Sequence, residues 1–167
     1  MTKENITQLR KDINKYIEVI ISSLNAKQKR IYNKTPINIT KFAITFNLTV
    51  NQFNHSEFES FIYKNGIWVN ENLSYEEKRF AIARELSYFI LCTLNNKSLD
   101  KKVEHIIKFN EDKYSKVHQL LDCFALCLLI PSNLIKKVDS NKINNLAQKF
   151  GVSPKHLLKR IELEGVS

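Results

Sequence analysis

The sequence predicts an α+β fold, namely a single, mainly helical domain with a small antiparallel sheet and a C-terminal helix-turn-helix-like segment. Three observations predict it. Apolar residues recur at helical spacing along most of the 167 residues. Two short runs rich in β-branched and aromatic residues flank Asn65-Gly66, a pair typical of a tight hairpin turn. The chain contains three glycines and three prolines without a linker-like tract, so one compact unit is expected.

Hydrophobic periodicity predicts the helices that precede the sheet. One long helix is expected in the N-terminal segment, residues 1–36, and it should end near Arg30. Its apolar stripe consists of Ile6, Leu9, Ile13, Ile17, Ile20 and Leu24. Residues 39–46 predict a short second helix, and the extended run 48–50 follows it.

A hairpin is expected in the middle of the chain, with strands at residues 58–63 and 67–69 on either side of the Asn65-Gly66 turn. Trp68, in the second strand, is the single tryptophan. Its large apolar ring is expected to pack the hairpin against the core, and an exposed role in an interface is the alternative.

Two apolar helices follow the hairpin. Ser74 and Glu77 form a capping-box pattern, which predicts a helix from residue 75 to about residue 94. A polar, lysine-rich crossing separates it from a strongly apolar helix at 117–130, which should stop before Pro131.

The C-terminal residues predict three short helices. Ser132 is expected to cap a helix that runs to Val138, and Ser140 a helix at 142–150 that ends at Gly151. Ser153 should cap the final helix, with Pro154 at its first position.

This C-terminal spacing is typical of a helix-turn-helix. The favoured interpretation is that the helices close the fold. The alternative is weak, sequence-blind contact with nucleic acid phosphates. The residues that would make it are Lys149, Lys155, Lys159 and Arg160.

The charge pattern favours no single function class. The net charge is +9, but lysine supplies 21 of the 26 basic residues, and lysine is weaker evidence for sequence-specific DNA binding than arginine. The chain has no signal-peptide pattern at its start, no apolar run long enough to span a membrane, and three cysteines without a CxxC motif. These features predict a cytoplasmic protein that makes no membrane contact.

Two segments carry a resemblance to a known family. Residues 80–89 read FAIARELSYF, and residues 124–131 read FALCLLIP. Together with the preceding strand, this pattern resembles the ImmA/IrrE family of bacterial zinc metallo-endopeptidases over roughly residues 37–163. The family's two helices read approximately R-F-x-x-A-H-E-L-G-H and E-x-x-A-N-x-F-A-x-x-L-L-M-P. The matching residues are Ile67, Val69, Asn70, Arg79, Phe80, Ala83, Glu85, Leu86, Phe124, Ala125, Leu128, Leu129 and Pro131.

The family's zinc ligands are not kept. The two histidines of the family's HExxH helix fall on Arg84 and Tyr88, and only Glu85, at the general-base position, remains. The third ligand falls on His118, unless an insertion within 95–117 brings Glu104 or Glu111 into range. Because arginine has no lone pair to offer a metal, no metal cofactor is expected, and zinc belongs only to an alternative interpretation.

The resemblance implies a zincin-like scaffold with a remnant cleft. Residues 37–131 are expected to form the degenerate metallopeptidase-like core, and 132–167 the C-terminal helices packed on the same domain. The cleft should contain Glu85 and four further residues. These are Arg84, Tyr88, His118 and Asp122. Asp122 is expected to pair with Arg84, and Tyr88 to lie under the guanidinium as a cation–π partner.

The predicted function is that of a catalytically inactive, protein-binding regulatory module. By resemblance, active relatives cut helix-turn-helix repressors that govern mobile elements or stress genes, and the cleft takes the target chain as an added strand. A helix-turn-helix repressor is therefore the partner that the family suggests. Two alternatives stay open: an active zinc-dependent endopeptidase with non-standard ligands, and a DNA-binding protein that uses the C-terminal helices.

Overall fold

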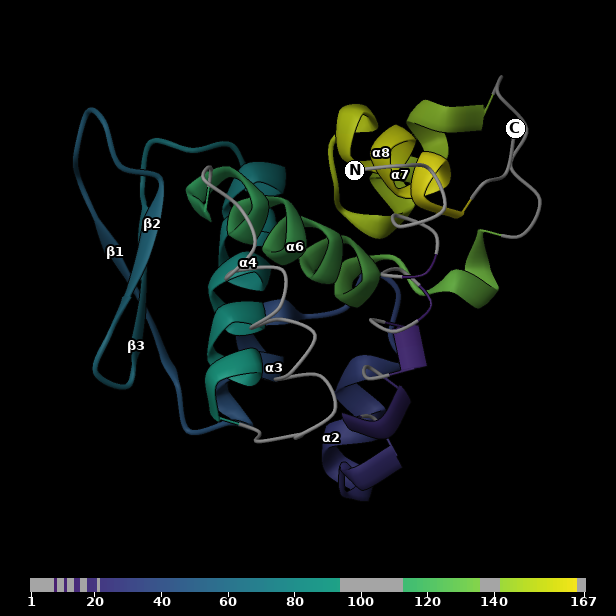
Figure 1. Cartoon of the computed structure of the whole chain (residues 1–167), viewed down its shortest axis with the longest axis horizontal. Helices are drawn as coiled ribbons and strands as arrows, with labels where there is room; N and C mark the ends of the chain where they lie inside the picture. Colours follow the sequence, from purple (N-terminus) through teal and green to yellow (C-terminus); the bar gives the residue numbers. More distant parts are fainter. Residues whose placement is uncertain are drawn as a thin grey trace.

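A computed structural model describes residues 22–93, 113–135 and 142–164, together with positions 8, 11, 14, 15 and 18–20; for residue 93 and residues 113–117 it describes the backbone alone. Figure 1 shows how the elements are arranged. In chain order they are α2 (Ala26–Tyr32), α3 (Ile39–Ile44), β1 (Thr49–Phe53), β2 (Ser60–Tyr63), β3 (Gly66–Asn70), α4 (Tyr75–Thr93), α6 (Lys113–Leu129), the 3-10 helix η1 (Ser132–Leu134), α7 (Ile143–Phe150) and α8 (Pro154–Glu164).

Helix α4 occupies the centre of the fold. It packs against β2 and β3 on one side and against α3 and α6 on the other, while α7 and α8 pack together and α8 contacts α6 (Figure 1). Ala83, Leu86 and Ile90 of α4 are fully buried, and so are Phe124, Leu126 and most of the other apolar residues of α6. The prediction of a mainly helical α+β domain is therefore confirmed.

The N-terminal helix is not continuous, so the prediction of one helix to Arg30 is wrong. The described positions from 8 to 23 are helical, and helix geometry stops at Leu24. Asn25 then caps α2, because its side chain accepts a hydrogen bond from the Gln28 amide (3.0 Å) while Gln28 accepts one from the Asn25 amide (2.9 Å). This reciprocal cap satisfies backbone donors that a continuous helix would have used internally.

The sheet has three strands in the order β1-β3-β2 and is mixed. The predicted antiparallel hairpin of β2 and β3 is present, with Phe61 opposite Trp68. The extended run that includes Val50 supplies β1, which pairs with β3 in parallel. An all-antiparallel sheet was therefore the wrong expectation. The reason is that β3, and not β2, lies next to β1 and runs parallel to it.

The hairpin turn also lies one residue earlier than predicted. Lys64 and Asn65 connect the strands, and Lys64 adopts a φ of 53°. Gly66 is the first residue of β3 and has no positive φ. A Cβ at Gly66 would come within 3.0 Å of the Asn51 side chain, so this glycine permits a close approach rather than a left-handed turn.

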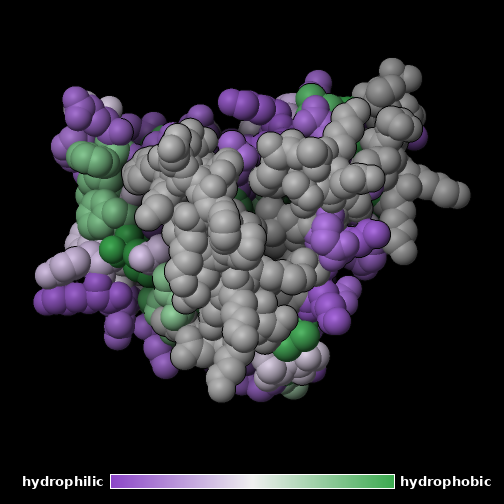
Figure 2. All heavy atoms as spheres, viewed as in Figure 1, coloured by the Kyte–Doolittle hydropathy of each residue, from purple (hydrophilic) through white to green (hydrophobic). Residues whose placement is uncertain are grey.

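The face of the sheet that points away from α4 carries aromatic rings. Ile67 and Val69 are buried, and Trp68 alternates with them onto the opposite face, where it stacks on Phe61 with ring centroids 6.2 Å apart. Phe53 joins this group at 5.0 Å from Phe61. Trp68 therefore does not pack against the core as predicted. Figure 2 shows apolar residues, in green, at the surface of the sheet end of the molecule.

The start of α4 agrees with the sequence. Ser74 Oγ accepts a hydrogen bond from the Glu77 amide (3.3 Å), and Glu77 accepts one from the Ser74 amide (3.0 Å), which confirms the capping box. Residue 94, the predicted end of this helix, lies outside the described residues. Helix α6 begins four residues earlier than predicted, at Lys113. Among the described residues, no helix combines the length and apolar character that a membrane span needs.

The C-terminal helices follow the predicted turn chemistry in part. Gly151 ends α7 in the left-handed conformation (φ 63°, ψ 43°), and Ser153 Oγ caps α8 by accepting a hydrogen bond from the His156 amide (3.2 Å). Ser132 does not cap η1; its hydroxyl accepts a bond from Arg160 (2.8 Å) and donates one to Glu164 (3.0 Å). Within the described residues up to 135, the predicted helix is represented by the three-residue η1. Val138 and Ser140 lie outside the described residues.

A buried arginine joins α4 to the segment before α3 and to the end of α7. Arg79 Nε donates to the carbonyl of Gly151 (2.8 Å), and its two terminal nitrogens donate to the carbonyls of Ile37 (2.8 Å) and Phe150 (3.2 Å). Because these carbonyls lie at the C-terminal end of α7 and just before α3, one side chain satisfies three buried acceptors from distant segments.

Replacing Gly151 with Ala should destabilise the protein. The positive φ strains any side chain, and a Cβ would also lie 2.9 Å from Arg79 Nε. We expect the free energy of unfolding, measured by urea denaturation, to fall by about 1–3 kcal/mol. Gly151→Asn is the matched control, because Asn tolerates positive φ but keeps the Cβ. If Gly151→Asn has the same free energy of unfolding as the native chain, the close approach of a Cβ to Arg79 does not contribute to the destabilisation.

His156 provides a test by pH. Its ring stacks on Phe80 with centroids 3.9 Å apart, and its Nδ1 is buried without a hydrogen-bond partner. Burial lowers the pKa of this imidazole from 6.5; Lys159 and Lys155 act in the same direction, and Asp122 and Glu77 oppose it. The unfolded chain therefore binds the proton more readily than the folded one.

Protonation of His156 should thus favour unfolding. We expect the free energy of unfolding to decrease as the pH falls below about 6.5. His156→Phe, which keeps a ring on Phe80 but cannot titrate, should flatten this part of the profile. An unchanged slope in His156→Phe would show that other groups cause the loss.

Candidate functional site

An ionic cluster lies where α4 passes the edge strand β2. Arg84 projects from α4, and one of its terminal nitrogens lies 3.3 Å from Glu59 Oε2, immediately before β2. Its Nε lies 3.9 Å from Glu85 Oε1. The Arg84 and Glu85 side chains are 19% and 14% exposed, whereas Glu59 is 61% exposed. The guanidinium therefore pairs with one largely buried and one exposed carboxylate.

Ser60 connects the members of this cluster. Its hydroxyl donates to Glu85 Oε1 at 2.8 Å and accepts from Arg84 at 3.2 Å. The strand register explains its position, since Ser60 pairs with the buried Val69 and points toward α4. Sequence reasoning missed both Glu59 and Ser60. The available signal was a polar residue at an inward position of a strand, two residues before the inward Ile62.

Tyr88 lies one turn beyond Arg84 on α4 and is 44% exposed. Hydrogen bonding with the Cys92 thiol raises the pKa of its phenol, with smaller contributions from the Cys92 charge, burial and Glu85. The cation–π contacts among the described residues join Lys64 to Tyr63 and Arg79 to Tyr75. The expected stacking of Tyr88 under Arg84 is therefore absent from this part of the chain.

Asp122 does not pair with Arg84 either. Its Oδ2 accepts a hydrogen bond from Lys159 Nζ at 2.8 Å, which joins α6 to α8. His118 is half-buried one turn earlier on α6, the helix that packs against α4. The structure thus brings together Arg84 and Glu85 of the predicted cleft and assigns Asp122 to the α6–α8 interface. The alternative ligands Glu104 and Glu111 lie outside the described residues.

The basic residues of the C-terminal helices do not form one exposed surface. Arg160 is fully buried; it donates to the Ile130 carbonyl (3.1 Å) and Ser132, and pairs with Glu164. The prediction that Arg160 contacts phosphates is therefore wrong, because its donors are consumed by the fold. Lys159 is engaged by Asp122, and the exposed Lys149 and Lys155 remain available.

The described side chains at this position do not fit a zinc ion. Zinc requires lone-pair donors, and Arg84 offers only hydrogen-bond donors. Glu85 Oε1 already accepts from Ser60 and faces the guanidinium. Among the described residues, no three His, Cys, Asp or Glu side chains lie close enough together to hold a metal ion. The positive charge at this position belongs to the Arg84 guanidinium itself.

Comparisons with known proteins agree with the fold. The model of a peptidase family, described as the IrrE N-terminal-like domain, matches residues 36–162. Among solved structures, a Mycobacterium tuberculosis transcriptional regulator is similar, with a TM-score of 0.63 and 14% sequence identity. The similarity covers 94% of this chain but only 52% of the regulator, and at this identity it concerns the fold alone. No functionally curated protein matches the sequence.

A double-mutant cycle should reveal the coupling of Arg84 and Glu85. Arg84→Met leaves a largely buried carboxylate without its cation, so we expect a loss of about 1–3 kcal/mol in the free energy of unfolding. Adding Glu85→Gln should cost much less than Glu85→Gln alone, because the two side chains interact. Glu59→Gln, at an exposed partner, should change stability by less than about 1 kcal/mol. Strictly additive effects of Arg84→Met and Glu85→Gln would contradict the pairing.

Proposed function

Because the chain belongs to the IrrE N-terminal-like domain family, we propose that it is a regulatory module that binds a protein partner without hydrolysing it. The observation that carries this proposal is the Arg84 cluster. The guanidinium lies where the sequence resemblance expects the family's first metal ligand, and it pairs with Glu59 and Glu85. A fixed positive charge there repels a divalent cation and occupies the carboxylate that would otherwise act as general base.

The state of Glu85 supports the loss of hydrolysis. A general base must accept a proton from a water held near the scissile bond. Here Glu85 accepts a hydrogen bond from Ser60, and its charge is compensated by Arg84. Both interactions hold the Glu85 side chain in place between α4 and β2. We therefore assign Glu85 a structural role at the position where the family resemblance places the catalytic base.

The exposed edge of β2 supports protein binding. β2 ends the strand order β1-β3-β2, so its outer backbone groups have no strand partner among the described residues. Phe61 and Tyr63 on this strand are both exposed. An extended peptide can add to such an edge by backbone hydrogen bonds and place apolar side chains on the exposed rings. A helix-turn-helix repressor is the partner that the family resemblance suggests.

Nucleic-acid binding by α7 and α8 is not proposed. Arg160 is fully buried and Lys159 is paired with Asp122. Of the four predicted contact residues, the exposed Lys149 and Lys155 remain, and two phosphate contacts give only weak, salt-sensitive binding.

The binding proposal is tested by co-purification. A tagged full-length chain should retain a protein partner from a lysate of the source cells, and Phe61→Asp with Tyr63→Asp should release it because charge is placed on the docking edge. Leu158→Asp, at an exposed apolar residue of α8, is the matched control and should keep the partner. Absence of any partner, or equal loss with both variants, would overturn the proposal.

The proposed loss of hydrolysis is tested on the same complex. Intact mass spectrometry should find the partner uncut after prolonged incubation with the purified chain and added zinc. Metal analysis of protein purified without added metal should find far less than one zinc per chain. Stoichiometric zinc, together with cleavage that Glu85→Gln abolishes, would establish the alternative of an active endopeptidase with non-standard ligands.

A further inference from the structure

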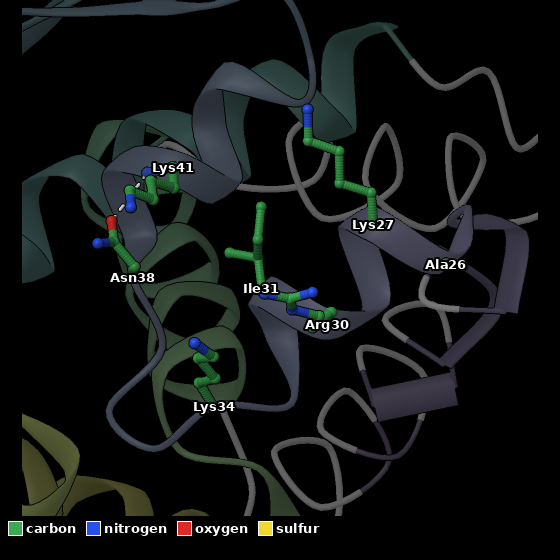
Figure 3. Close-up of a pocket in the computed structure, with 7 residues that line it drawn as sticks. All are labelled: Ala26, Lys27, Arg30, Ile31, Lys34, Asn38 and Lys41. Carbon is green, nitrogen blue, oxygen red and sulfur yellow. Dashed lines mark hydrogen bonds between the residues drawn. The ribbon is translucent and has the colours of Figure 1, made fainter.

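A basic pocket lies between α2 and α3, mostly before the residues that match the family. Its volume is about 630 Å³. Seven described residues line it: Ala26, Lys27, Arg30, Ile31, Lys34, Asn38 and Lys41. Figure 3 shows Ile31 in the middle of this set, with the four basic side chains around it. Volumes of this order are typical of sites for small molecules.

Helix geometry explains why the cations gather here. Lys27 and Arg30 are three residues apart on α2, so they share one side of that helix, and Lys34 lies in the bend that follows the end of α2 at Tyr32. Lys41 comes from α3, which packs against α2. A hydrogen bond from Gln28 Nε2 to the Thr45 carbonyl (3.2 Å) joins the two helices.

The positive charge of this pocket is uncompensated in the described part of the chain. No carboxylate among the described residues pairs with any of the four cations, and neither α2 nor α3 has an acidic residue in its first turn. By contrast, Arg84 and Arg160 each have a carboxylate partner. Four like charges around one concavity repel one another, and an anion that contacts several of them relieves this repulsion.

The chemistry of the pocket identifies the class of anion. A monovalent anion would compensate one charge of four, whereas a chain of phosphate groups can contact several lysine and arginine donors at once. Ile31 and Ala26 add apolar surface on which a flat ring or a sugar can lie. Asn38 Oδ1 accepts from the Lys41 amide (2.9 Å), and its amide nitrogen adds a polar donor at the rim.

We propose that the pocket between α2 and α3 binds a small ligand with several phosphate groups, of the nucleoside polyphosphate class. The size of this open pocket and its central apolar residue favour such a ligand over a nucleic-acid duplex, whose backbone requires an extended surface. This site is separate from the Arg84 cluster and does not depend on the proposed protein partner.

Titration calorimetry of the full chain at low ionic strength tests the proposal. ATP, ADP and AMP are the probes, and affinity should rise with the number of phosphates. Inorganic tripolyphosphate should also bind. We expect ATP to bind more tightly than tripolyphosphate, because its nucleoside can contact the apolar surface of Ala26 and Ile31. Arg30→Gln with Lys34→Gln should weaken ATP binding at least about ten-fold, by removing two charge-assisted contacts.

The control removes the same charge elsewhere. Lys149→Gln with Lys155→Gln, on the C-terminal helices, should leave ATP affinity within about two-fold, because long-range interactions between exposed charges are screened. All four substituted residues are exposed, and unchanged melting temperatures would show that the fold is intact. Equal weakening by both double variants, no binding of ATP or tripolyphosphate, or binding of duplex DNA alone would overturn the proposal.

Discussion

The buried guanidinium of Arg79 is the interaction on which the arrangement of this fold depends. It donates to carbonyls that precede α3 and end α7, and so ties α4 to segments that are distant in sequence. A buried cation is costly unless its donors are satisfied. Removing any of these segments would leave the charge or the carbonyls unpaired. The position of α4 is thereby restricted, and with it the side of α4 that faces β2.

The same residue type serves a different purpose one and a half turns later on α4. Arg79 meets neutral carbonyls, whereas Arg84 meets the carboxylates of Glu59 and Glu85. Both positions exploit the planar fork of donors, which lysine lacks. In the family pattern, a metal ion would supply positive charge at the second position. Here the Arg84 guanidinium supplies a positive charge and pairs with Glu59 and Glu85, and an arginine, unlike a metal ion, has no coordination position for a water molecule.

Local sequence signals predicted the ends of helices better than the contacts between residues that are distant in the sequence. The Ser74 capping box and the left-handed Gly151 follow from a few neighbouring residues, and both are present as expected. The pairing of Arg84 with Glu59 depends on strand register, which brings a residue from 25 positions earlier to α4. Helical spacing alone made Asp122 an equally reasonable partner. Lys159 competes for Asp122 from α8, and nothing near Asp122 in the sequence reveals that competitor.

The distribution of compensated and uncompensated charge separates the molecule into two regions. Around α4 and the sheet, the Arg84 cluster balances its own charge, and the exposed surface beside it is aromatic. Around α2 and α3, no described carboxylate offsets the cations, so any attraction there is directed at an external anion. Since α3 packs on α4, a ligand in this pocket would contact a direct neighbour of the helix that carries Arg84. Coupling would arise only if that ligand had different affinities for two arrangements of the α3–α4 contact, because equal affinities shift no equilibrium.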